Sequence, residues 1–177
     1  MSNFVNFITV ARIFLAPIIL TFLIFGEYLV CTILFFLAGM SDYFDGYLAR
    51  KYNAESQLGE ILDPIADKIL VVFILIGLSV SLHSYLMAVA SSFIISREIG
   101  VAALRDYAAR NNMSHKTKVT FIAKLKTAIQ LFTILLYFFG LSFNLNLLII
   151  IGDISLIAAT FLTLYTGYEY ANNIFTK

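Results

Sequence analysis

Six long apolar stretches fill most of this chain and constrain its fold more than any other feature. They cover residues 8–26, 29–50, 57–81, 85–109, 117–141 and 145–170. Each stretch is close to the ~20 residues that a helix needs to cross the hydrocarbon core of a bilayer. Of the 177 residues, 60% are hydrophobic and 13% are charged, which is far more apolar than a soluble domain requires. The sequence therefore predicts an all-α membrane bundle of six transmembrane helices.

Length and cysteine content limit the organisation of the chain. We expect a single membrane domain over residues 1–177, with residues 1–7 as an interfacial segment. That segment lacks the basic start and the cleavage site of a secretory signal peptide, so we expect it to be retained. The single Cys31 excludes an internal disulfide and gives no sign of an oxidising compartment.

Lysine and arginine flank only alternate connections between the apolar stretches. The basic residues concerned are Arg50, Lys51, Arg110, Lys116, Lys118 and Lys177. Because cytoplasmic loops carry the excess of positive residues, both termini are expected on the cytoplasmic side of the cell (inner) membrane. The same rule places residues 42–67 on that side.

Four aspartates stand at the ends of the second and third apolar stretches. Asp42 and Asp45 are three residues apart, and Asp63 and Asp67 are four apart, so each pair projects from one helix face. On insertion scales, aspartate at mid-membrane costs about 2.5 to 3.5 kcal/mol, so all four require compensation. Helix caps or basic partners could supply it, but the neighbouring Arg50 cannot balance four carboxylates even with Lys68. Two divalent cations with hard oxygen ligands account better for this pattern.

The aspartates belong to a longer pattern that resembles a known signature. The spacing D-x2-D-G-x2-A-R-x8-G-x3-D-x3-D is met in full between Asp42 and Asp67. It resembles the motif of the CDP-alcohol phosphotransferases. The resemblance implies a two-metal membrane enzyme that transfers a phosphatidyl group from a CDP-linked lipid to an alcohol and releases CMP. It also implies a cytoplasm-facing polar cavity and a homodimer.

By this resemblance, each position of the motif has an expected role. Two Mg²⁺ or Mn²⁺ ions are bound by Asp42, Asp45, Asp63 and Asp67. Asp67 is also the candidate general base, since that role requires an accessible carboxylate. The CDP group is bound by Asp42, Gly46, Ala49, Arg50 and Gly59. Simple helix packing is the alternative explanation for Gly46, and a positive anchor at the membrane edge is the alternative for Arg50.

Basic residues inside the fourth and fifth apolar stretches indicate a second anion site. Arg97 and Arg105 lie on one face of the fourth stretch, and Lys124 and Lys126 lie well inside the fifth. An acceptor that carries its own phosphate would satisfy these cations. Alternatively, Arg97 pairs with Glu98 or Asp106 of its own helix, and the lysines extend to the headgroups.

These two stretches resemble one branch of the family, the phosphatidylglycerophosphate synthases, which have R-E-x2-V-x3-R-like and K-x-K-T-x2-Q-like segments. The branch implies CDP-diacylglycerol as donor and glycerol 3-phosphate as acceptor. Inositol phosphate would also suit a basic pocket, whereas serine would need fewer cations; phosphatidylglycerol is a further alternative acceptor.

Arg12, inside the first stretch, must find an anion or extend to the headgroups.

A cation transporter is the alternative from a different functional class, since six helices with intramembrane carboxylates fit it loosely. It does not explain the spacing of Gly46, Arg50 and Gly59, or the basic fourth and fifth stretches. The many Phe and Tyr residues suit contact with membrane lipid and its interfaces rather than base stacking, so no nucleic acid partner is expected.

Overall fold

The computed structural model describes the backbone at residues 2–51, 57–111, 113 and 121–176, and the side chains at 8–41, 59, 61–111, 113 and 121–176. These residues form six α-helices and no strand. The helices are α1 (Ser2–Ile24), α2 (Tyr28–Lys51), α3 (Gln57–Ser81), α4 (Tyr85–Arg110), α5 (Phe121–Ser142) and α6 (Asn146–Phe175). The all-α class predicted from the apolar stretches is thus confirmed.

The helix boundaries follow the predicted stretches, with differences at both chain ends. Helix α1 begins at Ser2, so the residues expected as a separate interfacial segment form its first turns. Helix α6 continues past residue 170 to Phe175. The predicted break at residues 52 and 53 lies outside the described residues, as does the predicted start of the fifth stretch at residue 117.

Three tight turns connect helices on one side of the bundle. Gly26, His83 and Asn144 each adopt a positive φ, of 80°, 47° and 52° respectively. This left-handed conformation reverses the chain directly after a helix and suits glycine and asparagine best. At the second turn, the Ser84 side chain caps α4 by accepting a hydrogen bond from the backbone N–H of Met87. All three turns lie at breaks expected from the sequence.

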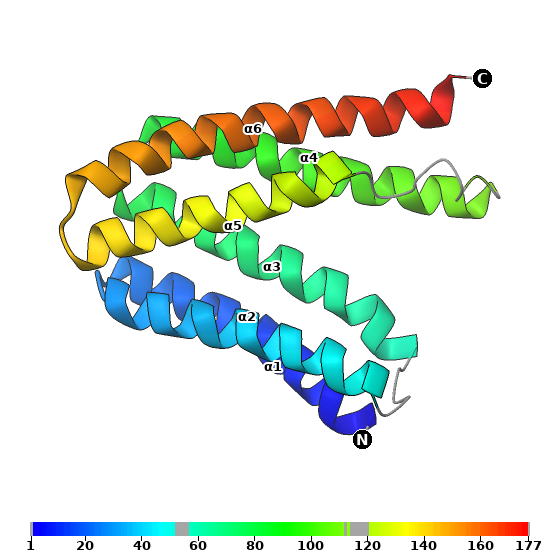
Figure 1. Ribbon diagram of the computed structural model, residues 1–177, viewed down its shortest axis with the longest axis horizontal. Coiled ribbons are helices and arrows are strands. Elements are labelled where there is room, and N and C mark those ends of the chain that lie inside the picture. Colours follow the sequence, from blue (N-terminus) through cyan, green and yellow to red (C-terminus); the bar gives the residue numbers. More distant parts are fainter. Residues whose placement is uncertain (1, 52–56, 112, 114–120, 177) are drawn as a thin grey trace.

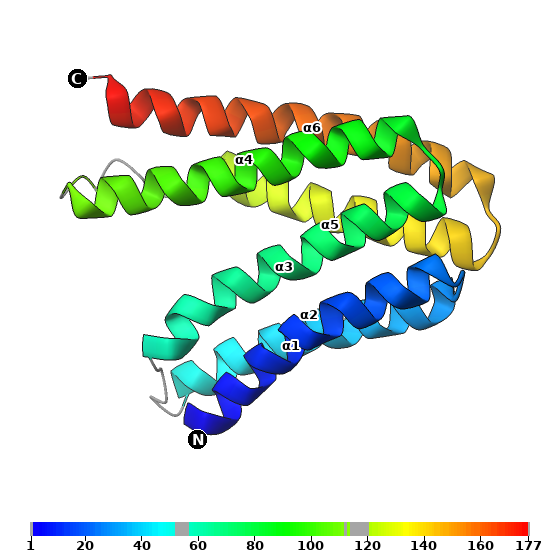
Figure 2. The ribbon, with the colours of Figure 1, turned by 180° about the vertical axis from the view of Figure 1, so that it is seen from behind.

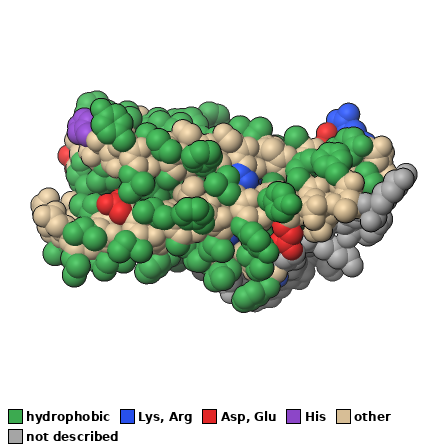
Figure 3. Space-filling view, turned by 90° about the horizontal axis from the view of Figure 1, so that it is seen from above, with side chains coloured by type: hydrophobic (Ala, Val, Ile, Leu, Met, Phe, Trp, Pro, Cys, Tyr) green, Lys and Arg blue, Asp and Glu red, His purple; other side chains and the backbone are tan. Residues whose placement is uncertain are grey.

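Among the residues whose side chains are described, three helices are long and apolar enough to cross a membrane, namely α4, α5 and α6. Two shorter apolar segments, Ile8–Ile24 and Tyr28–Ser41, lie in α1 and α2. Large apolar side chains are exposed around the bundle, among them Phe14, Phe25 and Phe161, and Figure 3 shows one face with apolar side chains over much of its surface. A membrane protein is the class that exposes so much apolar surface.

The helices form two groups that diverge toward one end of the bundle. Figures 1 and 2 show α1, α2 and α3 spreading away from α4, α5 and α6 toward the end where both chain termini lie. At the opposite end the groups are packed together, and Phe35 of α2 meets Phe138 of α5 edge to face with ring centroids 5.6 Å apart. The divergence opens space between α3, α4 and α5.

Helices α1 and α3 run in the same direction and pack closely (Figure 1). A Cβ atom on Gly77 of α3 would lie 2.6 Å from a methyl carbon of Leu23 in α1, so a larger residue here would require the Leu23 side chain to move. Four residues on, the Ser81 hydroxyl donates a 2.8 Å hydrogen bond to the Leu23 carbonyl oxygen. This contact fixes the height of α3 relative to α1.

Candidate active site

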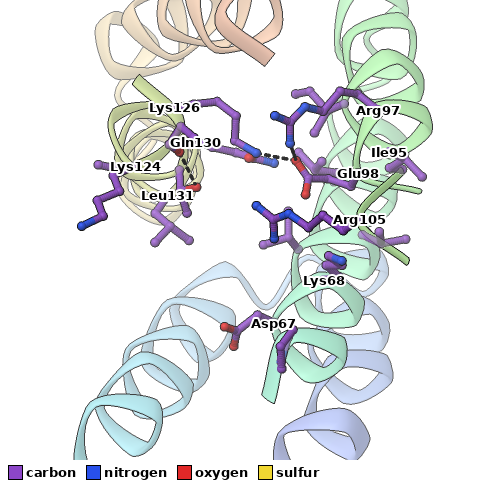
Figure 4. A pocket seen from close by; sticks show the side chains of 18 residues that line it. Asp67, Lys68, Ile95, Arg97, Glu98, Arg105, Lys124, Lys126, Gln130 and Leu131 are labelled. Atoms are coloured by element: carbon purple, nitrogen blue, oxygen red, sulfur yellow. Dashed lines mark hydrogen bonds and ion pairs between the residues drawn. The ribbon is translucent and has the colours of Figure 1, made fainter. Parts of the chain in front are cut away.

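A cavity of about 600 Å³ lies between α3, α4 and α5, where the two groups of helices diverge (Figure 4). Asp67 and Lys68 of α3 line one side of it. The other sides carry the predicted acceptor residues, which are Arg97, Arg105, Lys124 and Lys126, together with Glu98 and Gln130. The structure therefore brings the last aspartate of the motif and all four predicted acceptor cations to one cavity.

Glu98 is the centre of a charged cluster in this cavity. Its carboxylate accepts a 3.0 Å hydrogen bond from Arg97 and forms a second ion pair with Lys126 of α5. Lys126 is only 4% exposed, so its ammonium group is held away from bulk solvent. Because a buried cation requires a partner, Glu98 links α4 to α5. The sequence alternative in which Arg97 pairs with Glu98 is thus part of the observed arrangement.

Arg97 is held by α6 as well as by Glu98. Its Nε donates to the Thr163 carbonyl oxygen at 3.1 Å, and a terminal nitrogen donates to the Thr166 hydroxyl at 2.8 Å. Gly167 lies against the Arg97 side chain, since a Cβ atom there would come within 2.9 Å of Arg97 Cγ. These contacts fix the guanidinium at the wall of the cavity.

The remaining polar residues of the cavity differ in how firmly they are held. Arg105 donates a 3.0 Å hydrogen bond to the Tyr170 hydroxyl, with its guanidinium carbon 5.2 Å from the centre of that ring. Lys124 is exposed, and its ammonium group points away from the Glu98 cluster (Figure 4). Gln130 is 5% exposed, and its amide nitrogen has no hydrogen-bond partner among the described residues. A buried unpaired donor costs free energy, so Gln130 is suited to meet a ligand oxygen.

Asp67 and Asp63 are both held by α1. Arg12, which is 2% exposed, donates a 2.8 Å hydrogen bond to Asp67 Oδ1 and forms an ion pair with it. The fully buried Thr9 hydroxyl donates to Asp63 Oδ1, also at 2.8 Å. Of the two sequence alternatives for Arg12, the structure therefore shows the one with an anionic partner.

A second cavity, of about 620 Å³, lies on the other side of Asp67. Its walls are mostly apolar and come from α1, α2, α3 and α5, including Phe35, Phe36, Leu131 and Leu135. Asp67 lines this cavity and the polar one. The apolar cavity and the cationic cavity thus meet at the Asp67 carboxylate.

The first half of the aspartate motif is described only as backbone. Asp42, Asp45, Gly46, Ala49 and Arg50 all lie on α2, and their side chains are outside the described residues. Gly59, on the facing helix α3, is buried. Two of the four predicted metal ligands are therefore not placed, and among the described side chains no three acidic, histidine or cysteine residues converge on one point.

The donor atoms that are described suit a divalent cation. Asp63 and Asp67 supply carboxylate oxygens one turn apart on α3, and hard oxygen ligands are those that Mg²⁺ and Mn²⁺ prefer. Each carboxylate has a hydrogen-bonding partner behind it, as metal-binding carboxylates commonly have. These two residues therefore fit the predicted metal site.

Three residues of the site were not predicted as functional from the sequence. Glu98 was considered only as a local partner of Arg97, and neither Thr9 nor Gln130 was given a role. A carboxylate inside an apolar helix is a signal for Glu98, because an intramembrane charge is a functional candidate by default. Gln130 is the last position of the K-x-K-T-x2-Q-like segment, which is a signal for it, whereas the residue type of Thr9 gives none, since polar uncharged residues are tolerated in membrane helices.

Comparison with known proteins shows which family and which relatives this sequence is similar to. The family described as CDP-alcohol phosphatidyltransferase matches residues 2–165. A Rickettsia bellii protein is 40% identical, over 96% of this chain and 93% of its own. A Blochmanniella floridana protein is 35% identical over 97% and 90%, and a Haemophilus influenzae protein is 33% identical over 95% and 91%. All three relatives are named CDP-diacylglycerol--glycerol-3-phosphate 3-phosphatidyltransferase.

Proposed function

This chain belongs to the CDP-alcohol phosphatidyltransferase family, and from that premise we propose that it transfers a phosphatidyl group from CDP-diacylglycerol to glycerol 3-phosphate. The products are phosphatidylglycerophosphate and CMP. The observation that carries this choice of acceptor is the cavity in which Asp67 faces Arg97, Arg105 and Lys126. The names of the relatives support the same reaction.

The acceptor phosphate binds to the cations of α4 and α5. Arg97 and Arg105 each present a planar guanidinium group that can donate two parallel hydrogen bonds to phosphate oxygens. Lys126 adds a point charge from the opposite helix, and Lys124 lies at the rim of the same cavity. Gln130 donates its amide N–H to an oxygen of the acceptor. Serine carries no phosphate, so it would offer these cations less negative charge than glycerol 3-phosphate does.

The donor binds where α2 faces α3. Asp42, Gly46, Ala49, Arg50 and Gly59 form the CDP site by their place in the family motif. Asp42, Asp45, Asp63 and Asp67 hold two divalent cations, Mg²⁺ or Mn²⁺. When bound, such cations neutralise diphosphate charge and polarise the phosphorus that is attacked. The apolar cavity beside Asp67 receives part of the diacylglycerol group and opens toward the bilayer.

Asp67 acts as the general base. As a carboxylate it accepts the proton of the acceptor hydroxyl, whose oxygen then bonds to the lipid-side phosphorus of CDP-diacylglycerol. The bond from that phosphorus to the oxygen of the CMP group breaks, and CMP leaves with the electron pair. Position supports this role, because Asp67 lines both the cationic cavity and the apolar cavity.

The membrane arrangement is part of the same proposal. All six helices of the 177-residue domain cross the inner membrane, with both termini and the polar cavity on the cytoplasmic side. Support comes from the positive residues at alternate connections and from the two termini lying at the end toward which the two groups of helices diverge (Figure 1). The protein functions as a homodimer, as the family resemblance implies.

One assay tests the reaction. Purified protein in detergent is supplied with CDP-diacylglycerol, Mg²⁺ or Mn²⁺, and one acceptor at a time, and CMP is measured. The acceptors are glycerol 3-phosphate, inositol phosphate, serine and phosphatidylglycerol. We expect CMP formation with glycerol 3-phosphate, and its loss when the cation is removed with EDTA. Faster CMP formation with another acceptor would contradict the proposed substrate, and ion flux across liposomes containing the protein, without CMP formation, would favour a transporter.

A further inference from the structure

Two contacts join α1 to the second half of the aspartate motif. Thr9 Oγ1 donates to Asp63 Oδ1 and Arg12 donates to Asp67 Oδ1, both at 2.8 Å. Thr9 and Arg12 are three residues apart on α1, and their partners are four apart on α3. Because the two helices run in the same direction, successive turns meet in register (Figure 1). The two helices are still in contact at their far ends, where the Ser81 hydroxyl donates to the Leu23 carbonyl oxygen.

Burial separates these two donors from the substrate-facing residues. Thr9 is fully buried and the Arg12 side chain is 1% exposed, whereas Asp67 is 55% exposed at its side chain. Each donor therefore lies behind its carboxylate, on the side away from solvent. A charge as deeply buried as Arg12 is costly unless it is paired. The pairing thus constrains the Asp67 side chain as well as satisfying Arg12.

We propose that Thr9 and Arg12 are positioning residues, which fix the Asp63 and Asp67 carboxylates so that these are preorganised for metal binding and for proton transfer. The inference rests on the proposed function for the roles of Asp63 and Asp67. Thr9 lines neither cavity, and Arg12, which reaches the wall of the apolar cavity, has its guanidinium bonded to Asp67. Each fixes one named carboxylate oxygen through a hydrogen bond, and hydrogen-bonded supports of this kind orient metal ligands in general.

The Thr9 hydroxyl is tested by cation binding, which requires no turnover. Mn²⁺ is titrated into purified protein and unbound Mn²⁺ is measured by electron paramagnetic resonance. Thr9→Val removes the hydroxyl at nearly constant volume, and we expect the Kd for Mn²⁺ to rise about tenfold or more. Thr9→Ser keeps the hydroxyl and should stay near the wild-type value. Thr21→Val is the matched control in the same helix, because the Thr21 hydroxyl bonds only to the Pro17 carbonyl oxygen.

The role of Arg12 is tested by separating kcat from KM. In Arg12→Met we expect kcat to fall about a hundredfold, as misplacing a catalytic group by about 1 Å does, with both KM values nearly unchanged. Arg12→Lys retains the charge and should recover part of kcat. A rise in the KM for CDP-diacylglycerol alone would mean that Arg12 binds the donor, which would overturn its positioning role.

The outcomes distinguish this inference from the proposed reaction. Thermal unfolding first establishes that each variant is folded, and Thr9→Ala, which also removes the hydroxyl, replaces Thr9→Val if that variant does not fold. Unchanged Mn²⁺ affinity in folded Thr9→Val would overturn the inference while wild-type CMP formation still supported the reaction. Weaker Mn²⁺ binding in Thr9→Val would support the positioning role even if glycerol 3-phosphate proved to be the wrong acceptor.

Discussion

The Glu98 carboxylate on α4 forms an ion pair with the Lys126 ammonium on α5, across the cavity that also contains Asp67. This contact joins two helices through charges that lie within apolar segments. An anionic acceptor that enters the cavity meets Lys126 and Arg97 already oriented by Glu98. Glu98 thus determines where the two cations lie and how tightly they are held.

Glu98→Gln should destabilise the protein and weaken use of the acceptor. Removing one partner of a buried ion pair leaves the other charge uncompensated, which costs about 3 kcal/mol. We also expect kcat/KM for glycerol 3-phosphate to fall, because Lys126 loses its anchor. Thermal unfolding is measured for Glu98→Gln, Lys126→Met and the double variant. The double-mutant cycle should give a coupling free energy between the two residues of about 1 kcal/mol or more. Additive effects would show that the pair does not act as a unit.

Asp106→Asn is the control for these measurements. It removes an ion pair with Arg110 on the same helix, but both of those side chains are largely exposed. Exposed pairs contribute about 0 to 1 kcal/mol. We therefore expect little change in the unfolding temperature or in kcat/KM. A loss as large as that of Glu98→Gln would mean that net charge, and not the buried contact, explains both.

Arg105→Ala should raise the KM for glycerol 3-phosphate more than the KM for CDP-diacylglycerol. A hydrogen bond to a charged group contributes about 1.5 to 3 kcal/mol, so the acceptor KM should rise about tenfold or more. Steady-state kinetics with each substrate varied in turn measures both constants. Arg110→Ala is the control, since Arg110 lies on the same helix but is exposed at its end. An equal rise in both KM values would remove Arg105 from the acceptor site.

Asp67→Asn should bind the nucleotide and, with lower affinity, Mn²⁺, yet lose turnover even when Mn²⁺ is saturating. An amide is close in size to the carboxylate and can still accept a hydrogen bond from Arg12, but it is no proton acceptor at neutral pH. Loss of a general base lowers kcat about 10² to 10⁴-fold. CMP release and Mn²⁺ binding are measured on the same preparation. Near-normal turnover would exclude Asp67 as the base.

Asp153→Asn tests whether the loss of turnover in Asp67→Asn is specific to Asp67 or follows from removing any intramembrane carboxylate. Asp153 lies on α6 and accepts a 2.7 Å hydrogen bond from the Tyr137 hydroxyl, outside both cavities. Its replacement keeps an acceptor for that hydroxyl. We expect near-normal CMP formation, and a loss comparable to that of Asp67→Asn would argue against a specific catalytic role for Asp67.

Gln130→Leu should impair acceptor use without destabilising the fold. The Gln130 amide nitrogen is buried and has no partner among the described residues, so an apolar side chain of similar size removes an unsatisfied donor. The unfolding temperature should therefore stay constant or rise. The KM for glycerol 3-phosphate should rise several-fold, because one neutral hydrogen bond contributes about 1 kcal/mol to binding. A lower unfolding temperature with unchanged KM would make Gln130 a structural residue.

The helices, and the placing of Arg97 and Arg105 on one face of α4, could be predicted from sequence because they depend on local patterns. Apolar length determines the helices, and helical periodicity places Arg97 and Arg105 on one face. The partners of Arg12 and Lys126 could not be predicted in this way. Arg12 meets Asp67 across 55 positions, and Lys126 meets Glu98 across 28. Such pairings depend on which helices are neighbours, and apolar periodicity does not specify that order.

Gly167→Ala should impair the acceptor site from a helix that contributes no residue to the cavity. Gly167 on α6 lies against Arg97, and an added Cβ would come within 2.9 Å of Arg97 Cγ. Arg97 cannot retreat without losing its hydrogen bonds to Thr163 and Thr166. Overpacking of this kind costs about 1 to 3 kcal/mol. We therefore expect a lower unfolding temperature and a higher KM for glycerol 3-phosphate, with the KM for CDP-diacylglycerol unchanged.

Gly100→Ala provides the matched control on α4, three residues from Arg97. A Cβ atom at Gly100 would meet nothing within 4 Å. Alanine in a helix interior is favoured over glycine by about 1 kcal/mol, so this variant should be as stable as the wild type or more stable, with both KM values unchanged. If Gly167→Ala behaved like Gly100→Ala, the close contact of α6 with Arg97 would have no influence on the acceptor site.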